Sequence, residues 1–261
     1  MKHLIIVTIG VMLMSTQVLA FDLMGPTTSR LKDSGKASVG VEYVWSSMEI
    51  DAEGISALDL TSDTIDDFEI DKVTANLALG MGRGSEIFFR FGVADAGPDN
   101  NNDWGDIPDN IGSSDEVFVL GGGAKWTLYQ DANFGWGLLT QLSWAKYDFD
   151  GKSYFVGAHN VTLSTEFEIT EVQIATGPTF QINNNITIFG GPFLYFLNGD
   201  ADFDGTIDGS PAKVSADLEQ ESILGGYIGA GLELSPKASL AFEVQATSGS
   251  YGMGGSFVWK F

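Results

Sequence analysis

Apolar and polar residues alternate with a period of two over most of the chain, and this pattern constrains the fold more than any other feature. In the stretch 38–46, Val39, Val41, Tyr43 and Trp45 occupy odd positions, and mostly small or polar residues occupy even ones. Successive side chains of a β-strand point to opposite faces, so each such run predicts a strand with one apolar face. About ten runs follow one another, near residues 38–46, 72–81, 87–94, 118–128, 136–145, 166–177, 186–196, 227–234, 240–246 and 253–261.

The lengths of the runs and of their connections indicate a barrel that crosses a membrane. Each run is close to the roughly 9–11 residues of a tilted membrane-spanning strand, and no segment after residue 20 approaches the about 18 apolar residues of a spanning helix. Short turns on one side and long loops on the other are typical of such barrels. Here the short connections lie at 83–85, 130–134, 181–184 and 235–237, and they alternate with long ones at 50–67, 95–114, 150–162 and 198–218. The connection at 247–250 is the exception, because it is short where the alternation requires a long one. We therefore predict an all-β, transmembrane, antiparallel up-and-down β-barrel of about ten strands, with eight or twelve as the alternatives.

The first twenty residues have the pattern of a secretory signal. Lys2 and His3 precede the apolar stretch 4–14, and Ala20 ends a sequence suited to cleavage. The alternative is an uncleaved anchor helix. We predict a signal peptide at 1–20, a periplasmic N-terminal segment at 21–35 and the barrel at 36–261.

Large aromatic residues fall near both ends of the predicted strands. Amphipathic indole rings are stable at the boundary between lipid and water, so two aromatic girdles are expected. The alternative is that these are core tryptophans of a soluble β domain. The predicted girdles consist of Trp126, Trp136, Trp259 and Phe261 at the short-turn end and Trp45 and Trp144 at the other end.

The last eleven residues, 251–261, alternate apolar side chains and end in a phenylalanine. This stretch resembles the C-terminal signal of bacterial outer-membrane β-barrel proteins, which the barrel-assembly machinery reads in that superfamily. The resemblance covers the chain after residue 20 and indicates no narrower family. It implies a location in the bacterial outer membrane, in contact with lipid and lipopolysaccharide.

The inward faces of the predicted strands carry both acids and bases, although the whole chain has a net charge of −22. Buried charges are costly unless they are paired, so we predict internal salt bridges and a narrow or plugged lumen. A conducting path lined by the same charges is the alternative. The residues expected to meet near mid-height are Glu42, Arg90, Lys125, Glu171 and Glu243, with Asn76, Gln141 and Gln173 completing the network. The acidic charge makes nucleic acid an unsuitable partner.

An acidic outer segment resembles the first nine positions of an EF-hand calcium loop. The resemblance implies oxygen ligands from Asp200, Asp202, Asp204, the Thr206 carbonyl and Asp208. The twelfth position departs from the motif, because Pro211 supplies no carboxylate. Ordinary solvated turn chemistry is therefore the alternative to calcium binding.

The sequence offers no motif for catalysis. It has no cysteine, and after residue 20 its one histidine is His159, with no nucleophile or dyad motif beside it. We predict a non-enzymatic outer-membrane barrel with a structural role or limited permeability for small solutes. The alternative is a surface binding protein whose acidic outer loops bind calcium or a partner, and a remote alternative is an outer-membrane hydrolase.

Overall fold

The computed structural model describes residues 21–31, 33–51, 64–98, 117–156, 159–219, 223–248 and 250–261. Within these ranges no helix is long and apolar enough to cross a membrane. The described chain forms one antiparallel sheet of eleven strands. They are β1 (Ala37–Asp51), β2 (Thr64–Gly82), β3 (Ser85–Pro98), β4 (Val117–Gln130), β5 (Phe134–Val156), β6 (His159–Gln181), β7 (Ile186–Ile207), β8 (Ser210–Glu219), β9 (Ile223–Ser235), β10 (Ala238–Ala246) and β11 (Ser250–Lys260).

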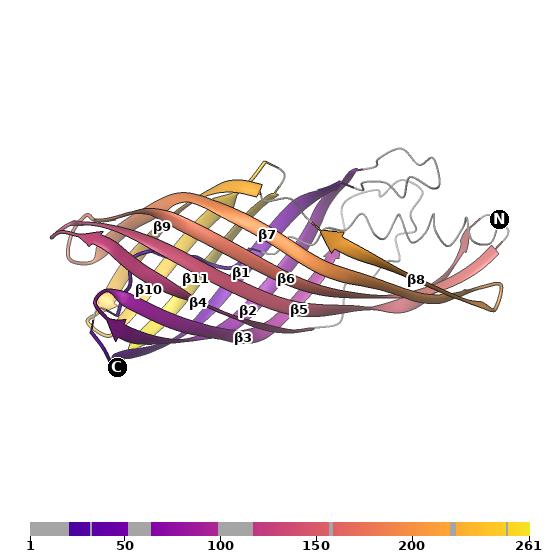
Figure 1. Ribbon diagram of the computed structural model, residues 1–261, viewed down its shortest axis with the longest axis horizontal. Helices are drawn as coiled ribbons and strands as arrows, with labels where there is room; N and C mark the ends of the chain where they lie inside the picture. Colours follow the sequence, from indigo (N-terminus) through magenta and orange to yellow (C-terminus); the bar gives the residue numbers. More distant parts are fainter. Residues whose placement is uncertain are drawn as a thin grey trace.

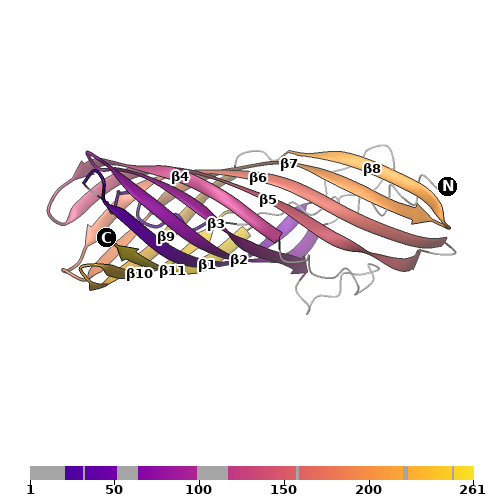
Figure 2. The ribbon, with the colours of Figure 1, turned by 90° about the horizontal axis from the view of Figure 1, so that it is seen from below.

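The sheet closes on itself as a barrel (Figures 1 and 2). Nearly every strand pairs with its neighbours in the sequence, and β1 pairs with β11 from Ser38–Lys260 to Met48–Ser250. β8 and β9 both pair with β7, one after the other, with an offset of one residue between the two registers. They therefore fill one position around the wall, which makes a ten-stranded barrel. This confirms the predicted fold class.

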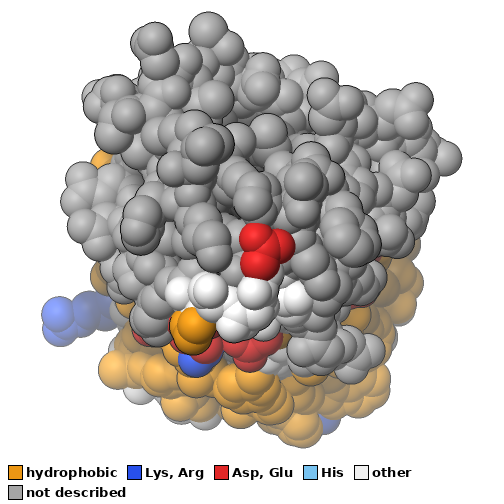
Figure 3. Space-filling model, turned by 90° about the vertical axis from the view of Figure 1, so that its right-hand side faces the viewer, with side chains coloured by type: hydrophobic (Ala, Val, Ile, Leu, Met, Phe, Trp, Pro, Cys, Tyr) orange, Lys and Arg blue, Asp and Glu red, His pale blue; other side chains and the backbone are white. Residues whose placement is uncertain are grey.

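The two faces of the wall differ as the alternation predicts. Outward side chains such as Val41, Phe89 and Phe242 are 55%, 59% and 64% exposed, while the inward Glu42 and Phe88 are buried. A continuous exposed apolar surface of this kind is unstable in water and suits contact with lipid. Seen from the right-hand side of Figure 1, hydrophobic side chains gather along the lower side of the barrel (Figure 3).

The two ends of the barrel also differ. Tight turns join β2–β3, β4–β5, β6–β7 and β9–β10 at the short-turn end, where Arg83 adopts a φ of 54° between two glycines. At the opposite, extended end, β5 continues past its last pair with β4, Val119–Ala145. From there β5, β6, β7 and β8 continue as four paired strands, which we name the projecting sheet (Lys146–Val156, His159–Glu168, Asn198–Ile207 and Ser210–Glu219). Eleven further residues of β5 would extend about 35 Å at the usual rise of a strand.

Two of the predicted long loops are therefore mostly strand. Residues 150–162 and 198–218 contain acidic, glycine and proline residues that are typical of turns, yet the structure places the described residues of both ranges in strands of the β5–β6 and β7–β8 hairpins. Cross-strand pairing with a neighbour outweighs this local turn preference, since each added strand pair satisfies backbone hydrogen bonds.

Candidate functional site

The N-terminal segment, for which the sequence predicts a periplasmic position, runs through the inside of the barrel. We name Phe21–Leu31 the plug segment. All of its residues except Gly25 and Arg30 are buried. At the short-turn end the chain leaves the lumen, and hydrogen bonds between Gly80 and the backbone of Gly35 and Lys36 lead it into β1. The segment lies inside because the wall offers partners for its backbone polar groups there.

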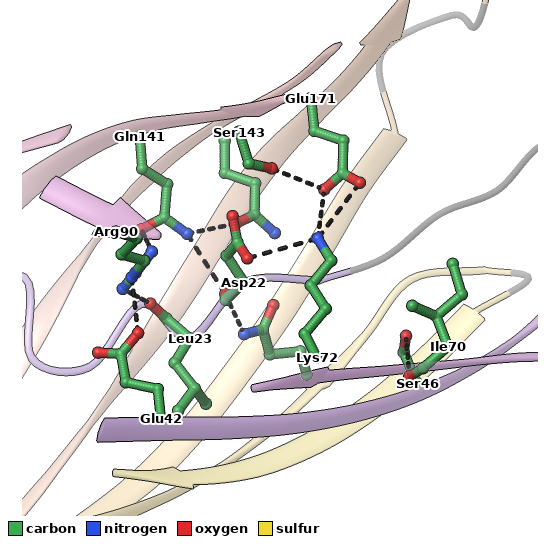
Figure 4. A network of polar contacts seen from close by, with 12 residues as sticks. Asp22, Leu23, Glu42, Ser46, Ile70, Lys72, Arg90, Gln141, Ser143 and Glu171 are labelled. Atoms are coloured by element: carbon green, nitrogen blue, oxygen red, sulfur yellow. Dashed lines mark hydrogen bonds and ion pairs between the residues drawn. The ribbon is translucent and has the colours of Figure 1, made fainter. Parts of the chain in front are cut away.

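Ion pairs surround the start of the plug segment (Figure 4). Lys72 Nζ lies 3.4 Å from Asp22 Oδ1 and 3.4 Å from Glu171 Oε2, and all three side chains are at most 7% exposed. Ser143 Oγ donates to the same Glu171 oxygen at 3.3 Å. One lysine from β2 thus bridges a carboxylate of the plug segment to a carboxylate of β6 on another part of the wall.

Phe21 lies beside this ion cluster. Its ring meets Phe193 and Tyr195 edge to face, with both centroid distances at 5.8 Å. Tyr147 and Tyr195 have 0% exposure, like Phe21. This layer of aromatic rings and ion pairs lies inside the barrel at the base of the projecting sheet.

A second group of charges lies nearer the short-turn end. Arg90 Nε lies 2.6 Å from Glu42 Oε2, and its Nη1 donates to Gln141 Oε1 at 2.9 Å (Figure 4). Its Nη2 donates to the carbonyl of Leu23, so one guanidinium joins two wall strands to the plug segment. A planar guanidinium suits simultaneous contacts with several partners because its N–H donors point in different, fixed directions.

Glu243 and Lys125 hold the middle of the plug segment. The Glu243 carboxylate accepts the backbone N–H of Met24 at 3.0 Å and of Gly25 at 2.7 Å. Lys125 Nζ donates to the carbonyl of Met24 at 2.7 Å. These charge-assisted bonds satisfy buried backbone groups that have no neighbouring strand to pair with.

Glu86 holds the last part of the plug segment in a similar way. Its Oε2 accepts the backbone N–H of Arg30 at 2.9 Å and of Leu31 at 3.0 Å, and the Ser29 hydroxyl at 3.2 Å. Thr127 Oγ1 accepts the N–H of Ser29 at 3.0 Å. The wall therefore contacts the plug segment along its whole length.

Glycines in the wall make room for this segment. A Cβ at Gly137 would lie 2.5 Å from the carbonyl carbon of Thr27 and 2.7 Å from the amide nitrogen of Thr28. A Cβ at Gly80 would similarly lie 2.9 Å from the carbonyl oxygen of Leu31. Both distances are too short for a real contact, so larger residues at these wall positions are incompatible with the plug segment as placed.

Two cavities lie beside the plug segment in the described lumen. One, of about 40 Å³, has Glu42, Arg90, Lys125 and Glu243 in its lining. The other, of about 230 Å³, opens toward the short-turn end. Arg30 lines both cavities. The smaller has room for a water molecule or two.

The aromatic residues assigned to the girdles lie on the outer face. Trp126, Trp136 and Trp259 are 38–41% exposed near the short-turn end, and Phe261 is 65% exposed there. Trp144 is half-buried toward the extended end, where its Nε1 donates to Glu168 at 2.9 Å. Trp45, also half-buried, meets Tyr251 edge to face at 5.6 Å.

The wall is closed and antiparallel, with an apolar outer face and a charged inner face, and its tight turns lie at one end. These features decide the fold. The chain folds as a closed, ten-stranded antiparallel β-barrel with an outer face suited to lipid. No protein-family model matches the chain, and no curated protein matches it in sequence.

Solved structures of outer-membrane barrels resemble it at low identity. The outer membrane protease OmpT from Escherichia coli has 10% identity and a TM-score of 0.43, covering 94% of this chain and 97% of its own. The translocator domain of the autotransporter NalP from Neisseria meningitidis has 10% identity and a TM-score of 0.47, covering 87% and 88%. Ail, the attachment invasion locus protein of Yersinia pestis, has 13% identity and a TM-score of 0.31, covering 87% and 99%. These likenesses concern the fold alone.

The five residues predicted to form a lumen network all line the interior of the barrel and are buried. Two of them, Glu42 and Arg90, contact each other directly. Glu171 pairs instead with Lys72, and Lys125 and Glu243 bind the plug segment. Three of the five therefore contact the plug segment directly, and the other two, Glu42 and Glu171, reach it through Arg90 and Lys72.

Sequence reasoning left four partners out of this network: Asp22, Lys72, Glu86 and Gln245. Asp22 lies in a segment without alternation, so nothing in the pattern predicts an inward side chain. Glu86 precedes the expected start of its strand by one residue, although it shares the inward face of Phe88 and Arg90. Extending the predicted strand 87–94 by one residue toward the N-terminus would have placed Glu86 on the inward face.

The predicted calcium loop differs from the structure in its backbone. Residues 200–207 are part of the extended strand β7, and the turn consists of Asp208, with a φ of 49°, and Gly209. Alternate residues of a strand are about 7 Å apart, so this backbone does not wrap around one point as a calcium loop does. Among the described residues no group of three or more acidic or histidine side chains could hold a metal ion. Calcium binding by Asp200, Asp202, Asp204, Thr206 and Asp208 remains a prediction.

Proposed function

We propose that this chain is a non-enzymatic outer-membrane β-barrel whose own N-terminal segment closes the lumen, so that small solutes pass only to a limited extent. The observation that carries the proposal is the burial of the plug segment and its backbone hydrogen bonds to Glu86 and Glu243. The proposal includes export by a signal peptide cleaved after Ala20. The chain would then begin at the ion cluster inside the barrel.

Planar-bilayer recording tests the closure. The native barrel is expected to conduct little, and a variant lacking residues 22–30 is expected to show stable open currents. A faster unboiled band on a denaturing gel must show that both proteins are folded barrels. Equal currents from the two folded proteins would contradict closure by the plug segment.

A reversible cross-link gives a sharper test, because the chain contains no cysteine. The Cβ of Thr28 lies 3.9 Å from the Cβ position of Gly135, within the usual range for a disulfide of about 3.5–4.5 Å. The double variant Thr28→Cys, Gly135→Cys is expected to conduct less when oxidised than when reduced. The single variant Thr28→Cys is the matched control, since it should respond to neither treatment. Loss of current on reduction would contradict the proposal.

A second candidate function is surface binding, and the projecting sheet favours it. Four paired strands extend beyond the barrel, and Asp204 and Asp208 are exposed near their tip. We propose calcium as a ligand of this acidic region. Calorimetric titration of the native barrel with calcium tests it, with Asp204→Asn, Asp208→Asn as the comparison variant. Equal heats of calcium binding from both proteins would mean that Asp204 and Asp208 are not calcium ligands.

The absence of enzymatic activity is part of the main proposal. His159 stands at the start of β6 within the projecting sheet. A screen with peptide and phospholipid substrates should show no hydrolysis by the folded barrel. Hydrolysis that is lost in His159→Ala would revive the hydrolase alternative.

A further inference from the structure

Wall side chains bind the carbonyl groups of the plug segment one after another. The Asp22 carbonyl accepts from Gln245 Nε2 at 2.8 Å and from Gln141 Nε2 at 3.3 Å. The next two carbonyls, of Leu23 and Met24, accept from the side chains of Arg90 and Lys125. Three consecutive main-chain acceptors are therefore satisfied by four wall side chains from different strands.

The wall also binds the main-chain amides. Glu243 accepts from Met24 and Gly25, and Glu86 accepts from Arg30 and Leu31. In both cases one carboxylate takes two consecutive N–H groups. Such contacts depend on the backbone and not on the identity of the side chains that follow it.

The shape of the wall fits a main chain as well. Gly137 lets the backbone of Thr27 and Thr28 approach the wall closely. Gly25 has a φ of +60°, and a Cβ there would lie 3.3 Å from Lys125 Nζ. The site therefore favours a glycine at this position of its ligand.

We propose that the lumen is a binding site for a peptide main chain, and that the plug segment is its resident and replaceable ligand. The ligand class is a short peptide with an aromatic residue followed by an acid at one end and a glycine three residues after the acid. The cavity of about 230 Å³ at the short-turn end is the entrance, because the plug segment itself leaves the lumen there. This inference rests on the proposed function, in which the segment closes the barrel.

The test uses the folded barrel that lacks residues 22–30 and a fluorescein-labelled peptide with the sequence of residues 21–31. Fluorescence anisotropy is expected to show saturable binding in trans. The peptide added from the short-turn side should also block the open currents. Binding is measured without reference to current, so it can fail while closure holds, and closure can fail while binding holds.

Two altered peptides separate main-chain recognition from side-chain recognition. Methylation of the Gly25 nitrogen removes one donor to Glu243 and is expected to weaken binding about tenfold or more. The change Met24→Leu keeps the side-chain volume and all main-chain groups, so it should change the affinity less than about tenfold. An N-methylated peptide that binds as tightly as the parent would overturn the proposal.

Wall variants provide the matching comparison. Glu243→Gln should weaken binding of the parent peptide, whereas Gly231→Ala should not. Gly231 also lines the larger cavity, but a Cβ there would have its nearest contacts at 3.8 Å, both on the wall. Equal affinities of the two variants would count against the site.

If the deletion variant does not fold, a protease cleavage site introduced between Asp33 and Ser34 gives a second way to free the plug segment. Both residues are exposed between the plug segment and β1. The intact chain then folds first, and cleavage afterwards leaves the plug segment as a separate peptide. The labelled peptide is expected to exchange into the cleaved barrel and not into the uncleaved one. No exchange into either would overturn the proposal.

Discussion

The lumen and the projecting sheet use the same kinds of residues in opposite ways. In the lumen, Lys72 and Glu171 form an ion pair whose side chains are 2% and 5% exposed. On the projecting sheet, Lys146 and Glu166 form one at 2.7 Å whose side chains are 40% and 43% exposed. The shorter pair is the more solvated one. Distance alone therefore says little about what an ion pair contributes.

Burial determines the consequences of losing a partner. A charge left alone inside the barrel has no water to replace its partner, whereas an exposed charge is solvated again at once. We infer that the lumen tolerates few substitutions and that the projecting sheet tolerates many. The predictions below test this contrast, in order of decreasing effect.

The largest effect is expected from Lys72→Met. The substitution leaves Asp22 and Glu171 buried without their shared cation, which should lower the free energy of unfolding by about 3–5 kcal/mol. Urea unfolding in detergent, followed by tryptophan fluorescence, measures it. The triple variant Asp22→Asn, Lys72→Met, Glu171→Gln removes all three charges and should recover most of the loss. A single variant within about 1 kcal/mol of the native barrel would contradict the contrast.

A smaller effect is expected from Gly137→Val, which places a side chain where the backbone of Thr27 lies. Overpacking of this kind usually costs about 1–3 kcal/mol, and release of the plug segment relieves it. The variant should therefore conduct in planar bilayers as the folded barrel without residues 22–30 does. Gly231→Ala is the control and should remain closed. A closed Gly137→Val barrel would show that the wall adjusts around the plug segment.

The alternation predicts the wall well because each wall residue faces one of two media. Val41 points outward and Glu42 inward, as their positions in the pattern require. The plug segment has no such pattern, since it is surrounded by wall on all sides and is held mainly through its main chain. Its amides and carbonyls are the same in every sequence. Nothing in the order of its side chains could therefore reveal its position.

The same reasoning explains which part of the network was predictable. Glu42, Arg90 and Glu171 belong to alternating strands, so their inward direction follows from the sequence. Their partners depend on register between strands distant in sequence and on the plug segment. The pairing of Lys72 with Asp22 across fifty residues has no local signal.

A moderate effect is expected from Glu86→Gln. Glutamine keeps an acceptor oxygen for Arg30 and Leu31 but removes the charge that strengthens both hydrogen bonds. The free energy of unfolding should fall by about 1 kcal/mol, clearly less than for Lys72→Met. The same urea titration measures it. A loss as large as that of Lys72→Met would mean that main-chain contacts matter as much as buried ion pairs.

The smallest effect is expected from Lys146→Ala at the start of the projecting sheet. Lys146 lies on the outward face, and removing it leaves Glu166 in contact with water. The urea midpoint should not change measurably, and the currents should stay those of the closed native barrel. Because this pair is shorter than the one at Lys72, an explanation based on distance predicts the opposite order. A midpoint shift comparable to that of Lys72→Met would favour distance over burial. It would also mean that the projecting sheet supports the barrel and does not merely extend from it.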